Sequence, residues 1–194
     1  MNLDDSYSPT RLADRMMIQD TLYRLSRAVD RLDCEAIRDC YHPDAYDNHG
    51  PYSGNVEGFI EWIRNRHQNN VVYSMHKLGN ILIEFARLDL ALVETYVWCV
   101  QRYSPHAKAA LAQLSGGKEG KPGVGMDLFS GSRYIDRFER RNGQWRVLRR
   151  TLVMDWKTML EVPSDVPQPL PTWPTGRRDK EDPLFLERAA LGIG

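Results

Sequence analysis

The chain has no excess of charge of either sign, and this absence excludes several classes of partner. Its 194 residues include 26 lysines and arginines and 26 aspartates and glutamates, so the formal net charge is zero. Nucleic acids and anionic membranes select clustered basic residues, so neither is expected as the main partner. Zero net charge also weakens repulsion between copies, and we therefore expect a homo-oligomer, either a dimer or a trimer.

Cysteine is scarce, and the apolar runs are short. The three cysteines, Cys34, Cys40 and Cys99, are odd in number and lack CxxC spacing, so neither a disulfide framework nor a zinc knuckle is predicted. The first ten residues lack the apolar segment of a signal peptide, and no run reaches membrane-spanning length. We expect a cytoplasmic protein, with a length that suits a single domain.

The first third of the chain has the spacing of helices. Residues 8–32 carry apolar side chains three or four positions apart, which predicts one buried stripe on a helix. The stripe consists of Ile18, Leu22, Leu25 and Val29. Shorter helices are predicted from residue 34 to about residue 41, capped by Asp33, and over residues 56–68.

Strand patterns dominate the rest of the chain. Four segments rich in β-branched and aromatic residues are predicted as long strands: 71–85, 90–103, 128–140 and 144–154. Helices separate from such an antiparallel sheet indicate an α+β fold. A strongly twisted sheet curls into a cone, which the N-terminal helices close. The predicted domain spans residues 1–157, and residues 158–194 are predicted to form a proline-rich extended arm.

The glycine-rich segment 104–127 interrupts the strand pattern, with room for about one helical turn. Loops of this length inside a compact domain are usually functional or disordered. We expect this segment and the C-terminal arm to isolate a site from water.

Two residues in separate elements are the first candidates for chemistry. Asp30 lies near the end of the first predicted helix, where a carboxylate opposes the helix dipole. His76 lies on the first long predicted strand, and strict alternation places Ser74, Leu78 and Leu82 on the same face. Taken singly, Asp30 reads as a solvated carboxylate, and His76 as a core histidine no less than a base. An aspartate partner would make the ring a competent base near neutral pH.

The segment HPDAYDNHG offers a second set of polar groups. Asp47 and His49 share one face of a short predicted strand, and Asp44 and Tyr46 share the other. The chain has neither an HExxH motif nor a spaced set of cysteines and histidines. A polar pocket wall is therefore favoured over a metal site.

Other polar and aromatic residues carry weaker signals. Tyr23 shares one flank of the first helix with Asp30. Tyr96 and Arg133 lie on predicted strands, where sheet packing is the simpler interpretation. The cluster RRNGQWRVLRR is interpreted as a solvated basic stripe or a subunit contact. The sequence has no glycine-rich phosphate loop and no GxSxG motif.

Several segments together resemble the SnoaL-like branch of the NTF2-like superfamily of cone-shaped α+β proteins. They are MIQDTLYRLSRAVDRLD, YHPDAYDNHGPYSG, HKLGNILIEF followed by ALVETYV, and RYIDRFERRNGQWRV. The resemblance covers about residues 10–157. Dehydratase and dehydrochlorinase members of this superfamily use an aspartate on the first helix and a histidine on the strand after the third helix. Asp30 and His76 match those places.

The resemblance implies a cofactor-independent lyase that acts on a small apolar, aromatic substrate in aromatic compound catabolism. His76 would be the general base, and Asp30 would orient it. The implied substrate-binding residues are Tyr23, Asp47, His49, Tyr96 and Arg133. The reaction would be an elimination of water, or of formaldehyde from a hydroxymethyl group. Two other functions stay open: a structural subunit like the β subunits of aromatic-ring dioxygenases, and a non-catalytic binder of an apolar ligand.

Overall fold

The elements follow the order expected of an α+β fold, with helices first and a run of long strands after them. A computed structural model describes residues 7–117, 121–163, 165–166 and 168–193. The helices are α1 (Pro9–Arg31), α2 (Cys34–Asp39), α3 (Val56–His67), α4 (Lys108–Ser115) and α5 (Pro183–Ala190). The strands are β1 (Tyr41–Asn48), β2 (Ser53–Asn55), β3 (Val71–Arg87), β4 (Leu90–Tyr103), β5 (Met126–Arg141) and β6 (Gln144–Glu161). The predicted fold class is confirmed.

The long helix α1 forms where its caps and its apolar stripe predict it. Ser8 accepts a hydrogen bond from the Arg11 N–H at 3.3 Å, and Pro9 presets the first helical position. The stripe residues Ile18 and Leu22 are buried. The helix ends where the following residue adopts a left-handed conformation, which turns the chain into α2. Neither α1 nor any other helix in the described part of the chain is long and apolar enough to cross a membrane.

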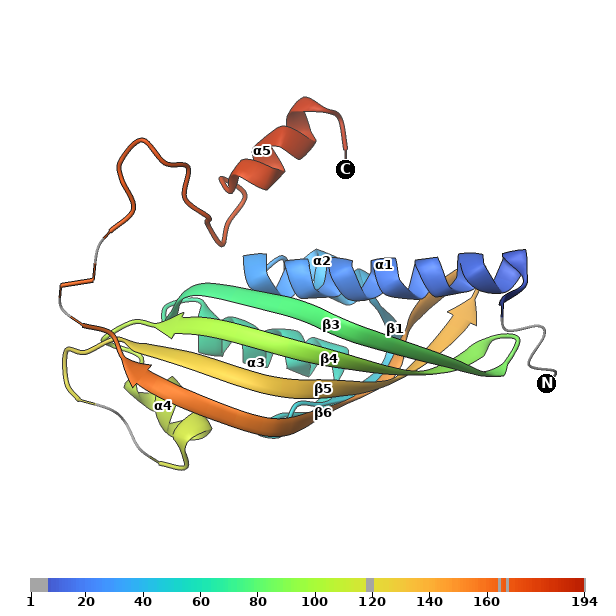
Figure 1. The fold of residues 1–194 in the computed structure, drawn as a ribbon, viewed down its shortest axis with the longest axis horizontal. Coiled ribbons are helices and arrows are strands. Elements are labelled where there is room, and N and C mark those ends of the chain that lie inside the picture. Colours follow the sequence, from blue (N-terminus) through green and yellow to red (C-terminus); the bar gives the residue numbers. More distant parts are fainter. Residues whose placement is uncertain (1–6, 118–120, 164, 167, 194) are drawn as a thin grey trace.

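The six strands form one curved, unclosed sheet in the order β2-β1-β6-β5-β4-β3. Strands β3 to β6 form the predicted antiparallel meander, and β1 joins β6 in parallel. The turn between β5 and β6 contains Asn142 and Gly143, both with positive φ, as a two-residue hairpin requires. Figure 1 shows α1 running alongside β3, so the helix that carries Asp30 lies against the strand that carries His76.

The face of β3 switches partway along the strand. The pairing register with β4 shifts between Leu78 and Ile81, which marks a β-bulge around Gly79. Beyond the bulge Ile83 is buried, whereas Leu82 is 57% exposed. The prediction that Leu82 shares the His76 face was therefore wrong, because one extra residue exchanges the two faces of a strand.

Two clusters of buried apolar residues lie inside the cone. The larger one joins α1, α2 and α3 to the sheet, and Ile18, Phe59 and Phe138 are among its members. The smaller one lies under α4 and includes Tyr103 and Leu111. α4 forms where the sequence allows about one helical turn, and its buried Ala110 and Leu111 pack in one cluster with Tyr103 and Leu128 of the sheet.

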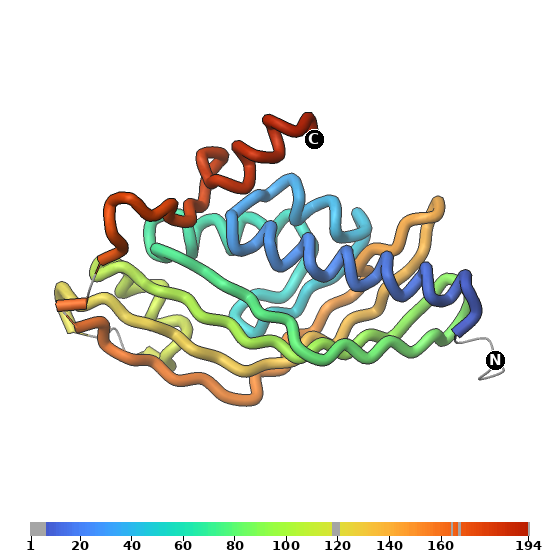
Figure 2. The backbone as a smooth tube through the Cα atoms, turned by 45° about the horizontal axis from the view of Figure 1, so that its top comes forward, coloured from blue at the N-terminus to red at the C-terminus, as the bar shows by residue number. Residues whose placement is uncertain are grey.

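The C-terminal segment is more structured than its composition predicts. β6 continues to Glu161 and so passes residue 157, and the arm ends in the helix α5. Asp182 caps α5 by accepting the Leu184 N–H at 3.0 Å. Figures 1 and 2 show the arm leaving the end of β6 and returning past the end of α1. The expected extended arm thus also contains a short helix, whose Asp-Pro start is a local signal inside a polar segment.

Candidate active site

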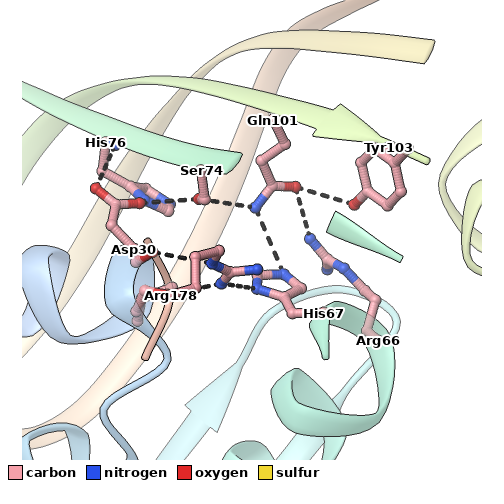
Figure 3. Close-up of polar contacts among 9 residues, drawn as sticks. Asp30, Arg66, His67, Ser74, His76, Gln101, Tyr103 and Arg178 are labelled. Carbon is pink, nitrogen blue, oxygen red and sulfur yellow. Dashed lines mark hydrogen bonds and ion pairs between the residues drawn. The ribbon is translucent and has the colours of Figure 1, made fainter. Parts of the chain in front are cut away.

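Asp30 and His76 meet across the seam between α1 and β3. The carboxylate oxygen Oδ1 of Asp30 lies 2.7 Å from Nδ1 of His76. Oδ2 of Asp30 accepts the backbone N–H of His76 at 2.8 Å, and Oδ1 also accepts the Ser74 hydroxyl at 2.8 Å. Figure 3 shows the three residues together. Because the carboxylate binds Nδ1, the other ring nitrogen, Nε2, is the one available to a substrate.

The charges of this pair stabilise each other. Burial raises the pKa of the Asp30 carboxyl, but the charge of His76 and the hydrogen bonds from His76 and Ser74 outweigh it, so that pKa lies below its ordinary value. Burial lowers the pKa of His76, whereas Cys99, Tyr134 and Asp30 raise it well above its ordinary value. The arrangement therefore favours an aspartate with an imidazolium, and the ring becomes a base only above its raised pKa.

A second carboxylate–imidazole pair lies at the end of β1. Asp47 is fully buried, and its Oδ1 lies 2.6 Å from Nδ1 of His49. Its other oxygen accepts the Tyr41 hydroxyl at 2.6 Å. Burial raises the pKa of Asp47, but His49, Arg150 and Tyr41 together bring it below its ordinary value. The site thus contains two histidines that each present one free ring nitrogen.

Both histidines line the same interior space. Two adjoining cavities, of about 190 Å³ and about 40 Å³, share five lining residues. These residues are His49, Arg66, His76, Gln101 and Tyr134. The His49 ring is held among aromatic rings, with centroids 4.8 Å from Phe59 and 5.9 Å from Tyr134. Both pairs therefore place a histidine ring on one pocket: His49 directly follows β1 and His76 lies on β3, while His67 at the end of α3 lines the smaller cavity as well.

A buried ion pair completes the wall near Asp47. Arg150 donates two hydrogen bonds to Asp136, at 2.6 and 2.8 Å, and its guanidinium lies 3.9 Å from the Tyr134 ring centroid. Arg150 belongs to the predicted basic stripe, so the interpretation of that whole stripe as solvated or in subunit contact was wrong. Its position follows from a register shift in the hairpin between Arg137 and Phe138, which no local pattern reveals.

Sequence reasoning also missed a set of polar residues behind the dyad. Gln101 is buried and donates from its amide to the Ser74 hydroxyl at 3.3 Å, and it accepts hydrogen bonds from Arg66 and Tyr103 at 3.0 and 2.9 Å. The signal was present in β4, where alternate residues face the interior and Gln101 is a polar residue at one of these buried positions. A buried amide in such a position requires partners, which here belong to the site.

The other predicted binding residues lie elsewhere. Tyr23 is 53% exposed and lines an outer groove of about 280 Å³ between α1 and β3, which His76 also borders. Tyr96 is 48% exposed on the outer face of the sheet. Arg133 is paired with Glu94 and Asp155 at 2.8 and 3.0 Å and lines neither interior cavity. The structure therefore brings His49 to the pocket with Asp47 hydrogen-bonded behind it, and places Tyr23 in a separate groove that shares only His76 with the pocket. Tyr96 and Arg133 lie apart from both.

The remaining polar residues of HPDAYDNHG have structural partners. Nε2 of His42 lies 2.9 Å from the Glu139 carbonyl oxygen, and Asp44 pairs with Arg141 at 2.6 Å. Within the described ranges, no three histidine, cysteine, aspartate or glutamate side chains are grouped so as to hold a metal ion.

The cone-shaped α+β fold and the family comparison together define the class of protein to which this chain belongs. The family description "SnoaL-like domain" matches residues 10–151, and the chain belongs to that family. The uncharacterized protein Rv2910c of Mycobacterium tuberculosis is 27% identical over 156 residues, covering 79% of this chain and 93% of the relative.

Solved structures share the fold. One is the hexachlorocyclohexane dehydrochlorinase LinA-type3 of Novosphingobium barchaimii, with a TM-score of 0.65 and 21% identity over 82% of this chain and 98% of the other. Another is a candidate scytalone dehydratase of Novosphingobium aromaticivorans, with a TM-score of 0.63 and 19% identity over 79% of this chain and 92% of the other. At these identities the likeness establishes the fold.

Proposed function

We propose that this protein is a cofactor-independent lyase that eliminates water or formaldehyde from a small aromatic substrate. The observation that carries the proposal is the hydrogen-bonded Asp30–His76 pair, whose imidazole ring lines the cavity of about 190 Å³. Burying a charged carboxylate–imidazole pair costs desolvation free energy. Two such pairs beside one pocket therefore favour a catalytic function over a purely structural one. The dehydratase and dehydrochlorinase names of the structural neighbours support an elimination reaction.

The chemistry starts at Nε2 of His76. The unprotonated ring takes a proton from the carbon next to the one that bears the leaving group, and the C–H electron pair becomes the new double bond. Asp30 stabilises the resulting imidazolium through Nδ1. His49 donates a proton to the departing oxygen, which leaves as water. General acid–base assistance of this kind contributes about a hundredfold to ten-thousandfold.

Loss of formaldehyde uses the same groups differently. His76 would take the hydroxyl proton of a hydroxymethyl side chain, and the C–C bond would break as the C=O bond of formaldehyde forms. The electron pair of the broken bond forms a new double bond and expels an oxygen leaving group on the neighbouring carbon, to which His49 donates its proton. In both reactions one histidine removes a proton and the other delivers one.

The pocket suits one aromatic ring. Its volume of about 190 Å³ is comparable to the roughly 150 Å³ apolar cavity that accommodates benzene in an engineered protein. Apolar side chains supply much of its wall, among them Leu114, Leu128, Leu152 and Met154. Leu114 comes from α4, so the 104–127 segment helps to separate the pocket from water, as the sequence suggests it should.

The test is a screen of aromatic alcohols and hydroxymethyl compounds with product detection by mass spectrometry. We expect the wild type to release water or formaldehyde from at least one of them. His76→Gln should lower turnover by about a hundredfold or more while the protein stays folded. A folded His76→Gln variant with wild-type turnover would contradict the proposal, and saturable ligand binding without product would identify a binding protein instead.

We also propose that the protein is a homo-oligomer, a dimer or a trimer. The outer face of the sheet supports this, because it exposes Met75, Trp98 and Trp156, with the two indole rings 5.1 Å apart. Sedimentation of a single monomeric species at micromolar concentration would contradict it.

A further inference from the structure

The C-terminal arm reaches the candidate site through one side chain. After β6 the arm passes the end of α1, and there Arg178 inserts between α1, α3 and β3 (Figures 2 and 3). Arg178 lies outside residues 10–151, the part of the chain that matches the SnoaL-like family description. Two ion pairs hold the arm just after it, Lys180 with Asp33 at 3.1 Å and Asp182 with Arg31 at 3.2 Å.

The guanidinium of Arg178 joins the helix that carries the aspartate to the strand that carries the histidine. It donates to the backbone carbonyls of Asp30 and Val29, at 2.9 and 3.0 Å, and to that of Val71 at 3.4 Å. The last carbonyls of a helix lack donors within the helix, and they form the negative end of its dipole. A cation with five fixed N–H donors suits this position better than a lysine would.

Arg178 also begins a chain of side-chain contacts that ends on the carboxylate of Asp30. Its Nη2 donates to Nδ1 of His67 at 2.8 Å, so the other ring nitrogen carries the proton and only packs against the Gln101 amide nitrogen, 3.5 Å away, without a hydrogen bond. Gln101 then donates to Ser74, and Ser74 donates to Asp30. Figure 3 shows this chain passing from the arm to the dyad.

The charge states agree with this arrangement. Burial, with the charges of Arg66 and Arg178, holds the pKa of His67 well below its ordinary value, so the ring is neutral and can accept a hydrogen bond from a guanidinium. Burial lowers the pKa of Arg178 to about 10, so this side chain remains a cation at neutral pH. A cation buried this far requires several acceptors, and Arg178 has four within hydrogen-bond distance.

We propose that Arg178 is a positioning residue for the Asp30–His76 pair, so that the C-terminal arm is part of the working site. It holds the last turn of α1 against the start of β3, and this fixes the distance between the carboxylate and the ring. The proposal rests on the proposed function for its catalytic meaning. Its measurement, however, reads the pair itself and requires no substrate.

The experiment compares adjacent arginines of the full-length protein. Arg178→Lys keeps the charge and removes the fork of donors, whereas Arg177→Lys changes a neighbour that pairs with the exposed Asp179. NMR titration of the His76 ring and the low-field signal of its Nδ1 proton report on the hydrogen bond to Asp30. In Arg178→Lys we expect a weakened Nδ1 signal and a fall in the His76 pKa of about one pH unit. Arg177→Lys should match the wild type.

An arm that only stabilises the fold, here called a strap, and an arm that positions the Asp30–His76 pair give different results. If Arg178→Lys lowers the melting temperature but leaves the His76 pKa and Nδ1 signal unchanged, the arm is only a strap and the proposal is overturned. Asp182→Asn is a second, milder variant, because it weakens the ion pair with Arg31 and the acceptor of the Arg177 N–H, and so loosens the arm next to Arg178 without changing the Arg178 side chain. It should move both His76 signals in the same direction as Arg178→Lys does, by a smaller amount. If the signals are unchanged in both variants, the proposal is contradicted.

These outcomes are separate from those that test the lyase. If the His76 signals respond to Arg178→Lys but His76→Gln leaves turnover unchanged, Arg178 positions a pair that is not catalytic. If the signals do not respond but His76→Gln abolishes turnover, the lyase proposal stands and the positioning role fails.

Discussion

The two carboxylate–imidazole pairs have nearly the same short contact but are assembled in different ways. Asp47 and His49 are two residues apart at one end of β1, so a single strand sets their geometry. Asp30 and His76 are 46 residues apart, on α1 and β3, and meet only when helix and sheet dock. The first pair is therefore a local structure, and the second depends on tertiary packing. If the reaction needs both pairs, a change in helix–sheet packing that separates Asp30 from His76 is enough to stop it.

The largest expected difference between the pairs concerns the leaving group. His76→Gln should slow elimination by about a hundredfold or more whether the leaving group is hydroxide or halide, because its proton abstraction is needed in both cases. His49→Gln should slow loss of hydroxide by about a hundredfold but loss of halide by less than about tenfold, because halide leaves without a proton.

The measurement is kcat for one substrate of the screen and for its halide analogue, with both folded variants. Equal losses for the two leaving groups in His49→Gln would mean that His49 only binds substrate. The two pairs would then not divide the roles of acid and base.

The next contrast lies in the pH dependence. A base works only when unprotonated, so with the halide substrate, which needs no proton donor, the raised pKa of His76 predicts that kcat/KM rises with pH and levels off above that pKa. Asp30→Asn removes a charge that raises this pKa, so the inflection should move to lower pH while the plateau falls. Asp47→Asn should leave this inflection in place.

A pH–rate profile of each variant checks this contrast. An inflection that moves equally in Asp30→Asn and Asp47→Asn would show that the two pairs titrate as one unit.

The smallest contrast concerns stability. Ser74→Ala removes the hydroxyl between Gln101 and Asp30, which leaves a buried amide without one of its acceptors. We expect it to lower the free energy of unfolding by about 1–3 kcal/mol. Ser53→Ala is the control, because Ser53 makes an exposed hydrogen bond to Asn48 near the other pair and should change stability by less than about 0.5 kcal/mol. Urea denaturation of both variants measures the difference, and equal values would contradict it.

Much of the fold was predictable because its signals are local. The helix spacing from Ile18 to Val29, the cap at Asp33 and the turn at Asn142 each act over a few residues, and the structure confirms α1, α2 and the β5–β6 hairpin. Taken singly, Asp30 and His76 had ordinary structural interpretations, and the family resemblance is what singled them out as a pair. Their contact agrees with the family resemblance.

The parts that sequence reasoning missed depend on register or on long-range contact. The bulge after Leu78 in β3 and the extra residue Leu148 in β6 each exchange the two faces for the residues that follow, and neither has a strong sequence signal. These shifts expose Leu82 and bury Arg150. Arg178 is 148 residues from Asp30, so only the folded chain can bring them together.

The arm also gives the protein a built-in chemical reporter. A groove of about 250 Å³ beside Arg178 is lined by both Arg178 and Cys34, whose thiol is partly exposed, while Cys40 and Cys99 are buried. The rate at which a small thiol reagent modifies Cys34 should therefore depend on the fraction of time for which Arg178 and the arm are bound against α1. Labelling kinetics on the unmodified chain would then time the opening of the arm, with the two buried thiols as the slow internal standard.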